Sequence, residues 1–126
     1  MDDVTTAHLP LSDGNSIPQL GLGVYKVGND LVTDLVSHAL SVGYRLIDTA
    51  SMYDNEAGVG HGLSRSDVPR EDIVLATKFW MDDLGYEGTL SACKKSLTSL
   101  GTDYVDLYLI HWPAPQRDLY LDSWKA

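Results

Sequence analysis

The sequence predicts an α/β fold built around a parallel sheet, and two observations support this prediction. Apolar segments of strand length alternate with segments whose apolar residues recur at helical spacing, in the order strand, helix, strand, helix, strand, helix, strand. This alternation is typical of right-handed βαβ crossovers, which place successive strands parallel in one sheet. Polar residues also close three of the strands, and parallel sheets carry their chemistry at that edge.

The first predicted element is a β-hairpin over residues 8–18. Asp13-Gly14 supplies its turn, and the flanking prolines suit short edge strands. Residues 20–25 are then predicted to form a buried strand, in which two glycines let another group approach the backbone closely.

The first predicted helix begins at Asn29 or Asp30, either of which can cap it, and runs to about Val42 before Gly43. The apolar residues expected on its buried face are Leu31, Leu35, Ala39 and Val42. The later predicted elements are a strand over 44–48, a helix over 56–64, a strand over 73–78, a helix over 88–100, a strand over 104–111 and the start of a helix over 119–126. The helix over 88–100 is expected to bury Leu90, Cys93, Leu97 and Leu100, with Gly101 at its end.

Composition and charge argue against several classes of binding partner. The chain has 126 residues, with 18 acidic and 9 basic side chains and a formal net charge of −9. Nucleic acid and anionic membranes need a basic binding face, so neither is expected as a partner. The single cysteine, Cys93, excludes an intrachain disulfide. The acidic start lacks a signal-peptide core, and no apolar run approaches the roughly 20 residues of a membrane span, so we expect a soluble cytoplasmic protein.

Four polar residues fall at or just after the carboxyl ends of three predicted strands. They are Asp48, Tyr53, Lys78 and His111. Neighbouring strands lie about 4.8 Å apart, so the strand-end side chains can converge within roughly 10 Å. A free phenol is a weak acid at neutral pH, but a nearby ammonium stabilises its phenolate. A carboxylate keeps such an ammonium charged, and an imidazole can orient a carbonyl group or relay a proton, so the four together suit proton transfer.

Each of these residues also has a purely structural explanation. Asp48 can cap the turn after its strand, and Tyr53 can pack within a loop. Lys78 can extend to water, and His111 can be an ordinary turn residue. Their joint placement on consecutive strand ends favours the functional interpretation.

Several motifs around these residues resemble one known family. They are Gly43-Tyr44-Arg45-Leu46-Ile47-Asp48-Thr49-Ala50, then Tyr53, Asn55-Glu56 and Gly58-Val59-Gly60, together with Leu20 to Lys26, Thr77 to Trp80 and Asp106 to Pro113. In this order they resemble the aldo-keto reductases, over essentially the whole chain from about His8 to Ala126. The likeness is closest to the bacterial diketogluconate and methylglyoxal reductase branch.

The resemblance implies a fold and an activity. The fold is expected to be the first half of a (β/α)8 TIM barrel, one domain over residues 1–126 that contains the hairpin and βα units 1–4 and stops within the fourth helix. The activity is expected to be NADPH-dependent reduction of an aldehyde or ketone. No metal is expected, and the partner is a small carbonyl compound.

The resemblance also implies site residues. The residues that match the family's catalytic tetrad are Asp48, Tyr53, Lys78 and His111, with tyrosine as the proton donor. The positions expected to hold the nicotinamide are Gly23, Val24, Tyr25 and Asp48. Trp80, His111 and Trp112 are expected to contact the substrate, although core packing explains the two tryptophans equally well.

A complete (β/α)8 barrel needs about 250 residues, and in this family most cofactor contacts come from the second half. Four parallel strands alone leave two free edges and an uncovered apolar face. Three interpretations stay open: a fragment of a longer product, pairing with itself or with a second chain to close the half barrel, or an open sheet covered in another way. We favour the first, because the sequence stops within a helical pattern. The alternative function is a catalytically silent half barrel that serves as an assembly or interaction module.

Three remaining features predict no separate site. The glycine-rich segment 58–62 does not lie between a strand and a helix start, so close helix packing explains it better than a phosphate loop. Cys93 is expected to be a buried hydrophobe. His8, His38 and His61 lack the spacing of metal ligands.

Overall fold

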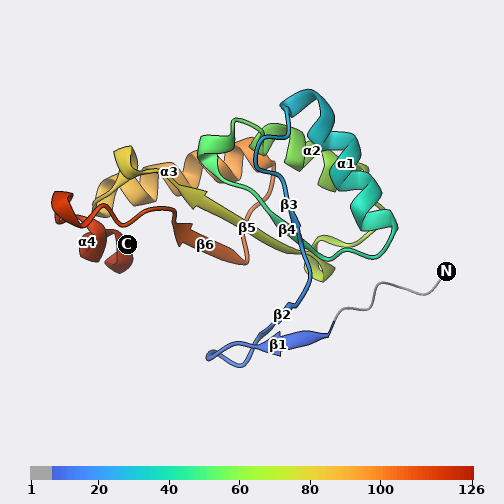
Figure 1. The fold of residues 1–126 in the computed structure, drawn as a ribbon, viewed down its shortest axis with the longest axis horizontal. Coiled ribbons are helices and arrows are strands. Elements are labelled where there is room, and N and C mark those ends of the chain that lie inside the picture. The colour runs from blue at the N-terminus through green and yellow to red at the C-terminus, as the bar shows by residue number, and fades with distance from the viewer. Residues whose placement is uncertain (1–6) are drawn as a thin grey trace.

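The structure, a computed structural model, describes residues 7–126, so the acidic start over residues 1–4 lies outside the described part (Figure 1). The elements are β1 (His8–Pro10), β2 (Ser16–Pro18), β3 (Leu22–Gly23), α1 (Asn29–Ser41), β4 (Leu46–Asp48), α2 (Glu56–Arg65), β5 (Val74–Phe79), α3 (Tyr86–Leu100), β6 (Leu107–Ile110) and α4 (Tyr120–Lys125). Short 3-10 turns lie at Ser51–Tyr53, Arg70–Asp72, Met81–Asp83 and Pro115–Arg117. The predicted alternation of strands and helices is confirmed, including the start of the helix near residue 120.

Strands β3, β4, β5 and β6 form one parallel sheet in chain order. Figure 1 shows α1, α2 and α3 on the same side of this sheet, as same-handed crossovers require. The predicted hairpin is confirmed as the antiparallel pair β1–β2, which projects away from the helices.

The main core lies between the sheet and the helices. Ile47 and Leu75 point from neighbouring strands into a cluster with Val32, Val36 and Val59 of the helices, and all five are fully buried. A second cluster of Phe79, Leu84, Ala92 and Ala114 forms near the carboxyl end of the sheet.

Helix α2 packs so closely that it needs its glycines. A Cβ added at Gly62 would lie 2.7 Å from the Cβ of Val36 on α1, and one at Gly60 would collide with the carbonyl group of Leu100. Real Cβ atoms do not approach other atoms this closely, so only glycine fits. Close helix packing is therefore confirmed as the reason for the glycine-rich segment 58–62.

The buried face of α1 differs from the prediction. Its buried residues are Val32, Val36, Ala39 and Leu40, so the prediction is confirmed for Ala39, whereas Leu31 is 65% exposed. The expected cap is also wrong, because Gly28 precedes the helix and Asn29 is its first residue. The side chain of Asn29 instead accepts a hydrogen bond from the backbone N–H of Gly58 on α2, at 2.8 Å.

Two further sequence expectations were wrong. The strand expected over residues 20–25 is only Leu22–Gly23, with Leu20 and Tyr25 exposed. In α3 the buried face consists of Thr89, Ala92, Ser96 and Leu100, so the prediction holds for Leu100, but Cys93 is only half-buried. The prediction followed large apolar residues, whereas three of the four residues buried in α3 are small.

The other face of the sheet is apolar and partly open. Tyr108 and Ile110 pack against the Phe79 cluster, so by alternation Leu109 points to the opposite face, where it is 41% exposed. In the part of the chain from Ala7 onward, no helix is long and apolar enough to cross a membrane.

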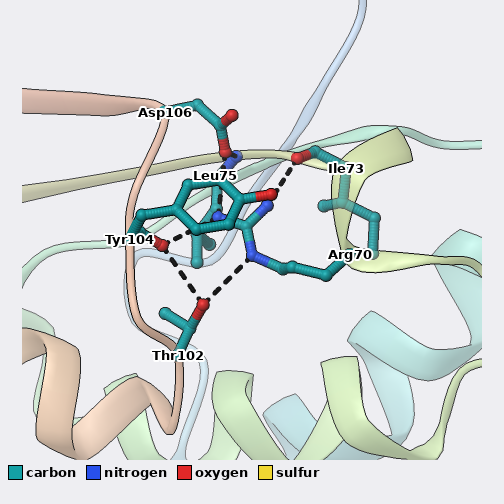
Figure 2. A network of polar contacts seen from close by, with 6 residues as sticks. All are labelled: Arg70, Ile73, Leu75, Thr102, Tyr104 and Asp106. Atoms are coloured by element: carbon teal, nitrogen blue, oxygen red, sulfur yellow. Dashed lines mark hydrogen bonds and ion pairs between the residues drawn. The ribbon is translucent and has the colours of Figure 1, made fainter.

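The amino ends of β5 and β6 are joined by a polar network centred on Arg70 (Figure 2). Its guanidinium donates to Thr102 Oγ1, to the carbonyl oxygens of Ile73 and Tyr104, and to Asp106 Oδ2, over 2.7–3.2 Å. It also lies 4.0 Å from the centre of the Tyr104 ring. Asp106 Oδ2 accepts a second hydrogen bond from the N–H of Leu75 at 2.9 Å. This network joins the amino ends of β5 and β6. At their carboxyl ends Phe79 pairs with Ile110, and the N–H of His111 donates to the carbonyl oxygen of Phe79 at 3.2 Å.

Candidate active site

The four polar residues predicted to converge come from adjacent strands. Asp48 is the last residue of β4, Lys78 is the penultimate residue of β5, and His111 directly follows β6. Tyr53 ends the 3-10 turn Ser51–Tyr53, which begins three residues after β4. The strands are parallel, so all four residues lie at the carboxyl edge of the sheet.

Lys78 and Asp48 form the centre of this group. Lys78 Nζ donates to both carboxylate oxygens of Asp48, at 2.8 and 2.9 Å, and to the carbonyl oxygen of Thr49, at 2.8 Å. The Lys78 side chain is only 14% exposed, and the ammonium uses all three of its N–H bonds. The carboxylate therefore holds a nearly buried cation in place. Sequence reasoning missed Thr49, because its contribution is a backbone carbonyl that any residue type can supply.

Tyr53 lies beside this ion pair. Lys78 Nζ is 5.2 Å from the centre of the Tyr53 ring, close enough for a cation–π interaction. No hydrogen bond described for residues 7–126 joins the ammonium to the Tyr53 hydroxyl, so the contact between the two side chains is the one with the ring. The rings of Tyr25 and His111 flank the phenol, with centroids 5.0 and 5.7 Å from its own.

His111 is held between aromatic rings. Its ring meets those of Tyr53 and Trp80 edge-on, each at an interplanar angle of 81°. Burial lowers the pKa of His111 below its ordinary value, and the charge of Lys78 lowers it further, while Asp48 opposes both effects. The imidazole is therefore neutral at physiological pH. Its Nδ1 is buried and has no hydrogen-bond partner within residues 7–126.

The two tryptophans extend this aromatic wall. Trp80 contacts both His111 and Trp112, with centroid distances of 5.1 and 5.0 Å. Trp112 is 57% exposed, so core packing does not explain it. Trp80 therefore lies between His111 and the exposed ring of Trp112.

Four residues were expected to hold a nicotinamide. Asp48 is bonded to Lys78, and the other three differ in what they offer. Gly23 pairs with Asp48 in the sheet, is exposed, and would place an added Cβ in open space. Tyr25 is exposed and stacks beside Tyr53. The Val24 side chain is fully buried in the core, so only its backbone can face a ligand. No group of three or more histidine, cysteine, aspartate or glutamate side chains within residues 7–126 is placed to hold a metal ion.

A buried polar network, absent from the sequence predictions, lies directly beneath this site. Asn55 and Thr49 are both fully buried and hydrogen-bonded to each other, and the hydroxyl of Thr77 donates to Glu56 at 2.8 Å. The motif Asn55-Glu56 stands in the sequence, but its position at a helix start suggests local capping. Nothing in the spacing shows that its side chains reach other segments.

Comparison with known proteins identifies the family. The sequence model of the aldo/keto reductase family matches residues 19–126. The methylglyoxal reductase DkgA of Salmonella typhimurium is 50% identical over 116 residues, which make up 92% of this chain and 42% of that relative. An aldo/keto reductase from Brucella melitensis superposes with a TM-score of 0.93 at 55% identity, covering 97% of this chain and 47% of that one. A Bombyx mori aldo-keto reductase solved in complex with NADP gives a TM-score of 0.88 at 37% identity, covering 97% and 45% of the two chains.

The chain thus spans less than half the length of the curated relatives it matches. Its hairpin and four-stranded parallel sheet correspond to part of the (β/α)8 barrel of those reductases. The chain belongs to the aldo-keto reductase family.

Proposed function

We propose that this chain is the catalytic N-terminal half, residues 1–126, of an NADPH-dependent carbonyl reductase. One observation carries the proposal: the Lys78–Asp48 ion pair lies beneath the ring of Tyr53, and His111 closes the same site. An ion pair that serves only stability does not need a phenol and an uncharged imidazole at its exposed side. Their convergence at the carboxyl edge of a parallel sheet is the arrangement that proton transfer requires.

The residues present fit a nicotinamide. Gly23 leaves open space on the sheet face next to Asp48, and the exposed ring of Tyr25 borders it. When bound, the cofactor would supply a hydride to the carbonyl carbon of the substrate. Gly23, the Val24 backbone, Tyr25 and Asp48 would line its nicotinamide end.

Each catalytic residue then has a defined task. As the carbonyl carbon gains the hydride, its oxygen gains negative charge and takes the proton of the Tyr53 hydroxyl. Lys78 stabilises the phenolate left behind, and Asp48 holds Lys78 in position. Neutral His111 can donate an N–H to the carbonyl oxygen and orient it toward Tyr53.

The substrate we propose is a small aldehyde or ketone. Trp80 and Trp112 would form an apolar wall beside His111, which suits a short carbon chain. Methylglyoxal is the first compound to test, because it appears in the name of a 50% identical relative. A cytoplasmic location is part of this proposal, and cell fractionation tests it.

Turnover of NADPH with methylglyoxal tests the proposal. The protein to use is a chimera in which residues 1–126 replace the matching part of the Brucella melitensis reductase. Tyr53→Phe should lower kcat by about 100-fold to 10,000-fold, the usual contribution of a general acid. Tyr104 precedes the amino end of β6, away from the candidate site, so Tyr104→Phe is the matched control and should retain full activity. Equal turnover by wild type and Tyr53→Phe would exclude tyrosine as the proton donor.

A second candidate function rests on the exposed inner face of the sheet. The chain alone would be a catalytically silent half barrel that associates with itself or with a second chain through this face and the free edges of β3 and β6. Titration of NADPH into the 126-residue chain separates the two candidates. Tight binding excludes the silent role, whereas a folded, associated chain that does not bind NADPH supports it.

A further inference from the structure

We infer that Asn55 is a positioning residue that holds Tyr53 and Tyr25 in place over the Lys78–Asp48 pair. The inference rests on the proposed function, because it concerns the geometry of the same site. Asn55 touches neither Lys78 nor any open surface, and it is fully buried.

The side chain of Asn55 does not perform the task that its position predicts. It is the residue before α2, where asparagine normally accepts a hydrogen bond from the first turn of the helix. Here it makes no such cap. A departure from a strong local preference at a buried position indicates a role elsewhere.

Asn55 instead joins separate segments of the rim. Its Oδ1 accepts a hydrogen bond from the hydroxyl of Thr49 at 2.7 Å. Its Nδ2 donates to the carbonyl oxygens of Val24 and Val27, each at 3.0 Å. Both N–H bonds and one acceptor site are used, and among side chains of this size only an amide offers both kinds of group.

Each of these contacts leads to a residue of the proposed site. The carbonyl oxygen of Thr49 accepts a hydrogen bond from Lys78 Nζ. Asn55 and the Lys78 ammonium therefore both bind Thr49. Val24 precedes Tyr25, whose ring lies 5.0 Å from that of Tyr53. The bonds of Asn55 therefore hold the loop that carries Tyr25 against the strand end that carries Asp48.

The connection from Asn55 back to Tyr53 is a single residue in an uncommon conformation. Asp54 has φ 57° and ψ 28°, the left-handed region that non-glycine residues seldom adopt. Such a backbone persists only when its surroundings determine it. Asp54 joins Asn55, which makes three hydrogen bonds, to Tyr53, which lies between two rings.

Matched Asn→Asp substitutions test the inference in the 126-residue chain itself. Asn55→Asp removes both donors and turns a carboxylate toward two carbonyl oxygens. Asn29→Asp introduces the same charge, but Asn29 only accepts a hydrogen bond, so this variant keeps its contact. With tyrosine-labelled protein, nuclear Overhauser effects between the Tyr25 and Tyr53 rings should be lost in Asn55→Asp and retained in Asn29→Asp.

If Asn55→Asp does not fold, a second pair of smaller substitutions tests the same inference. Thr49→Val replaces the hydroxyl that donates a hydrogen bond to Asn55 Oδ1, whereas Thr49→Ser keeps that hydroxyl. Contacts between the two tyrosine rings should weaken in Thr49→Val and be restored in Thr49→Ser. Unchanged ring contacts in Thr49→Val, or in a folded Asn55→Asp, would overturn the positioning role.

Turnover in the chimera then separates this inference from the proposed function. A misplacement of about 1 Å can cost about 100-fold in rate, so Thr49→Val should lower kcat by at least about tenfold and leave KM for methylglyoxal nearly unchanged. An inactive wild-type chimera would refute the proposed function while the ring contacts still decide the role of Asn55. An active chimera whose kcat is the same in Thr49→Val and Thr49→Ser would overturn the inference alone.

Discussion

His111 is the residue whose charge state most directly affects the candidate site. A protonated imidazole there would face the Lys78 ammonium, and burial also disfavours its charge. The folded protein therefore binds this proton at lower pH than the unfolded chain does. The neutral state of His111 contributes stability above about pH 6.5, and this contribution is lost as the pH falls through the lowered pKa.

The lowered pKa of His111 predicts how the stability of the chain changes in acid. The unfolding midpoint of the wild-type chain should fall more steeply between pH 7.5 and pH 5 than that of His111→Gln, which has no group to protonate. Urea unfolding at each pH measures the difference. Parallel profiles for wild type and His111→Gln would show that His111 titrates as in the unfolded chain.

The Lys78–Asp48 pair should matter more for stability than a surface pair. Asp48→Asn is expected to cost about 1–2 kcal/mol, less than for a fully buried pair because the Asp48 side chain is 38% exposed. Asp34→Asn breaks the exposed pair between Asp34 and Arg65 and should cost less than about 0.5 kcal/mol. Equal losses in the free energy of unfolding for the two variants would mean that Lys78 is solvated rather than held.

At the scale of elements, substitutions at two glycines distinguish a glycine needed for helix packing from one that leaves room for a ligand. Gly60→Ala places a methyl group against the carbonyl of Leu100 and should destabilise the chain by about 1–3 kcal/mol. Gly23→Ala meets no atom within 4 Å and should leave the unfolding midpoint unchanged. If the nicotinamide lies against Gly23, the same change should weaken NADPH binding by the chimera. Loss of stability in Gly23→Ala would contradict the open space described beside Asp48.

Element type and order could be predicted from the sequence, but the faces and ends of elements could not. Hydrophobic period and turn residues predicted the hairpin and the alternation of strands and helices, because these are local signals. The buried face of α1 was predicted incorrectly because α2 approaches through glycines, and that contact decides which side of α1 is covered.

The candidate site also has one part that the sequence predicts and one part that it does not. The gathering of Asp48, Lys78 and His111 follows from parallel strands ending at one edge, so strand-end residues alone predict it. The hydrogen bonds of Thr49 and Asn55 reach across separate segments through a backbone carbonyl and a buried amide. No spacing in the sequence encodes such contacts.

At the scale of the whole molecule, the sheet determines how the chain behaves in solution. Strands β3 and β6 are the two edges of the sheet within the described residues, and Leu109 of β6 is exposed on its open face. The 126-residue chain is therefore expected to associate in a concentration-dependent way, and the chimera, whose sheet is closed, to remain monomeric. Sedimentation analysis of both proteins tests this. A monomeric 126-residue chain at high concentration would mean that the edges are covered within the chain.

The central claim is that Tyr53 and Lys78 act as one catalytic unit, and a double-mutant cycle on kcat tests it most directly. Tyr53→Phe, Lys78→Met and the double variant are compared in the chimera with NADPH and methylglyoxal. When two residues act as a unit, removing either one already abolishes their shared contribution to kcat. The double variant should therefore be no slower than the slower single variant. Two losses that multiply in the double variant would show that Lys78 and Tyr53 contribute independently, which contradicts the claim.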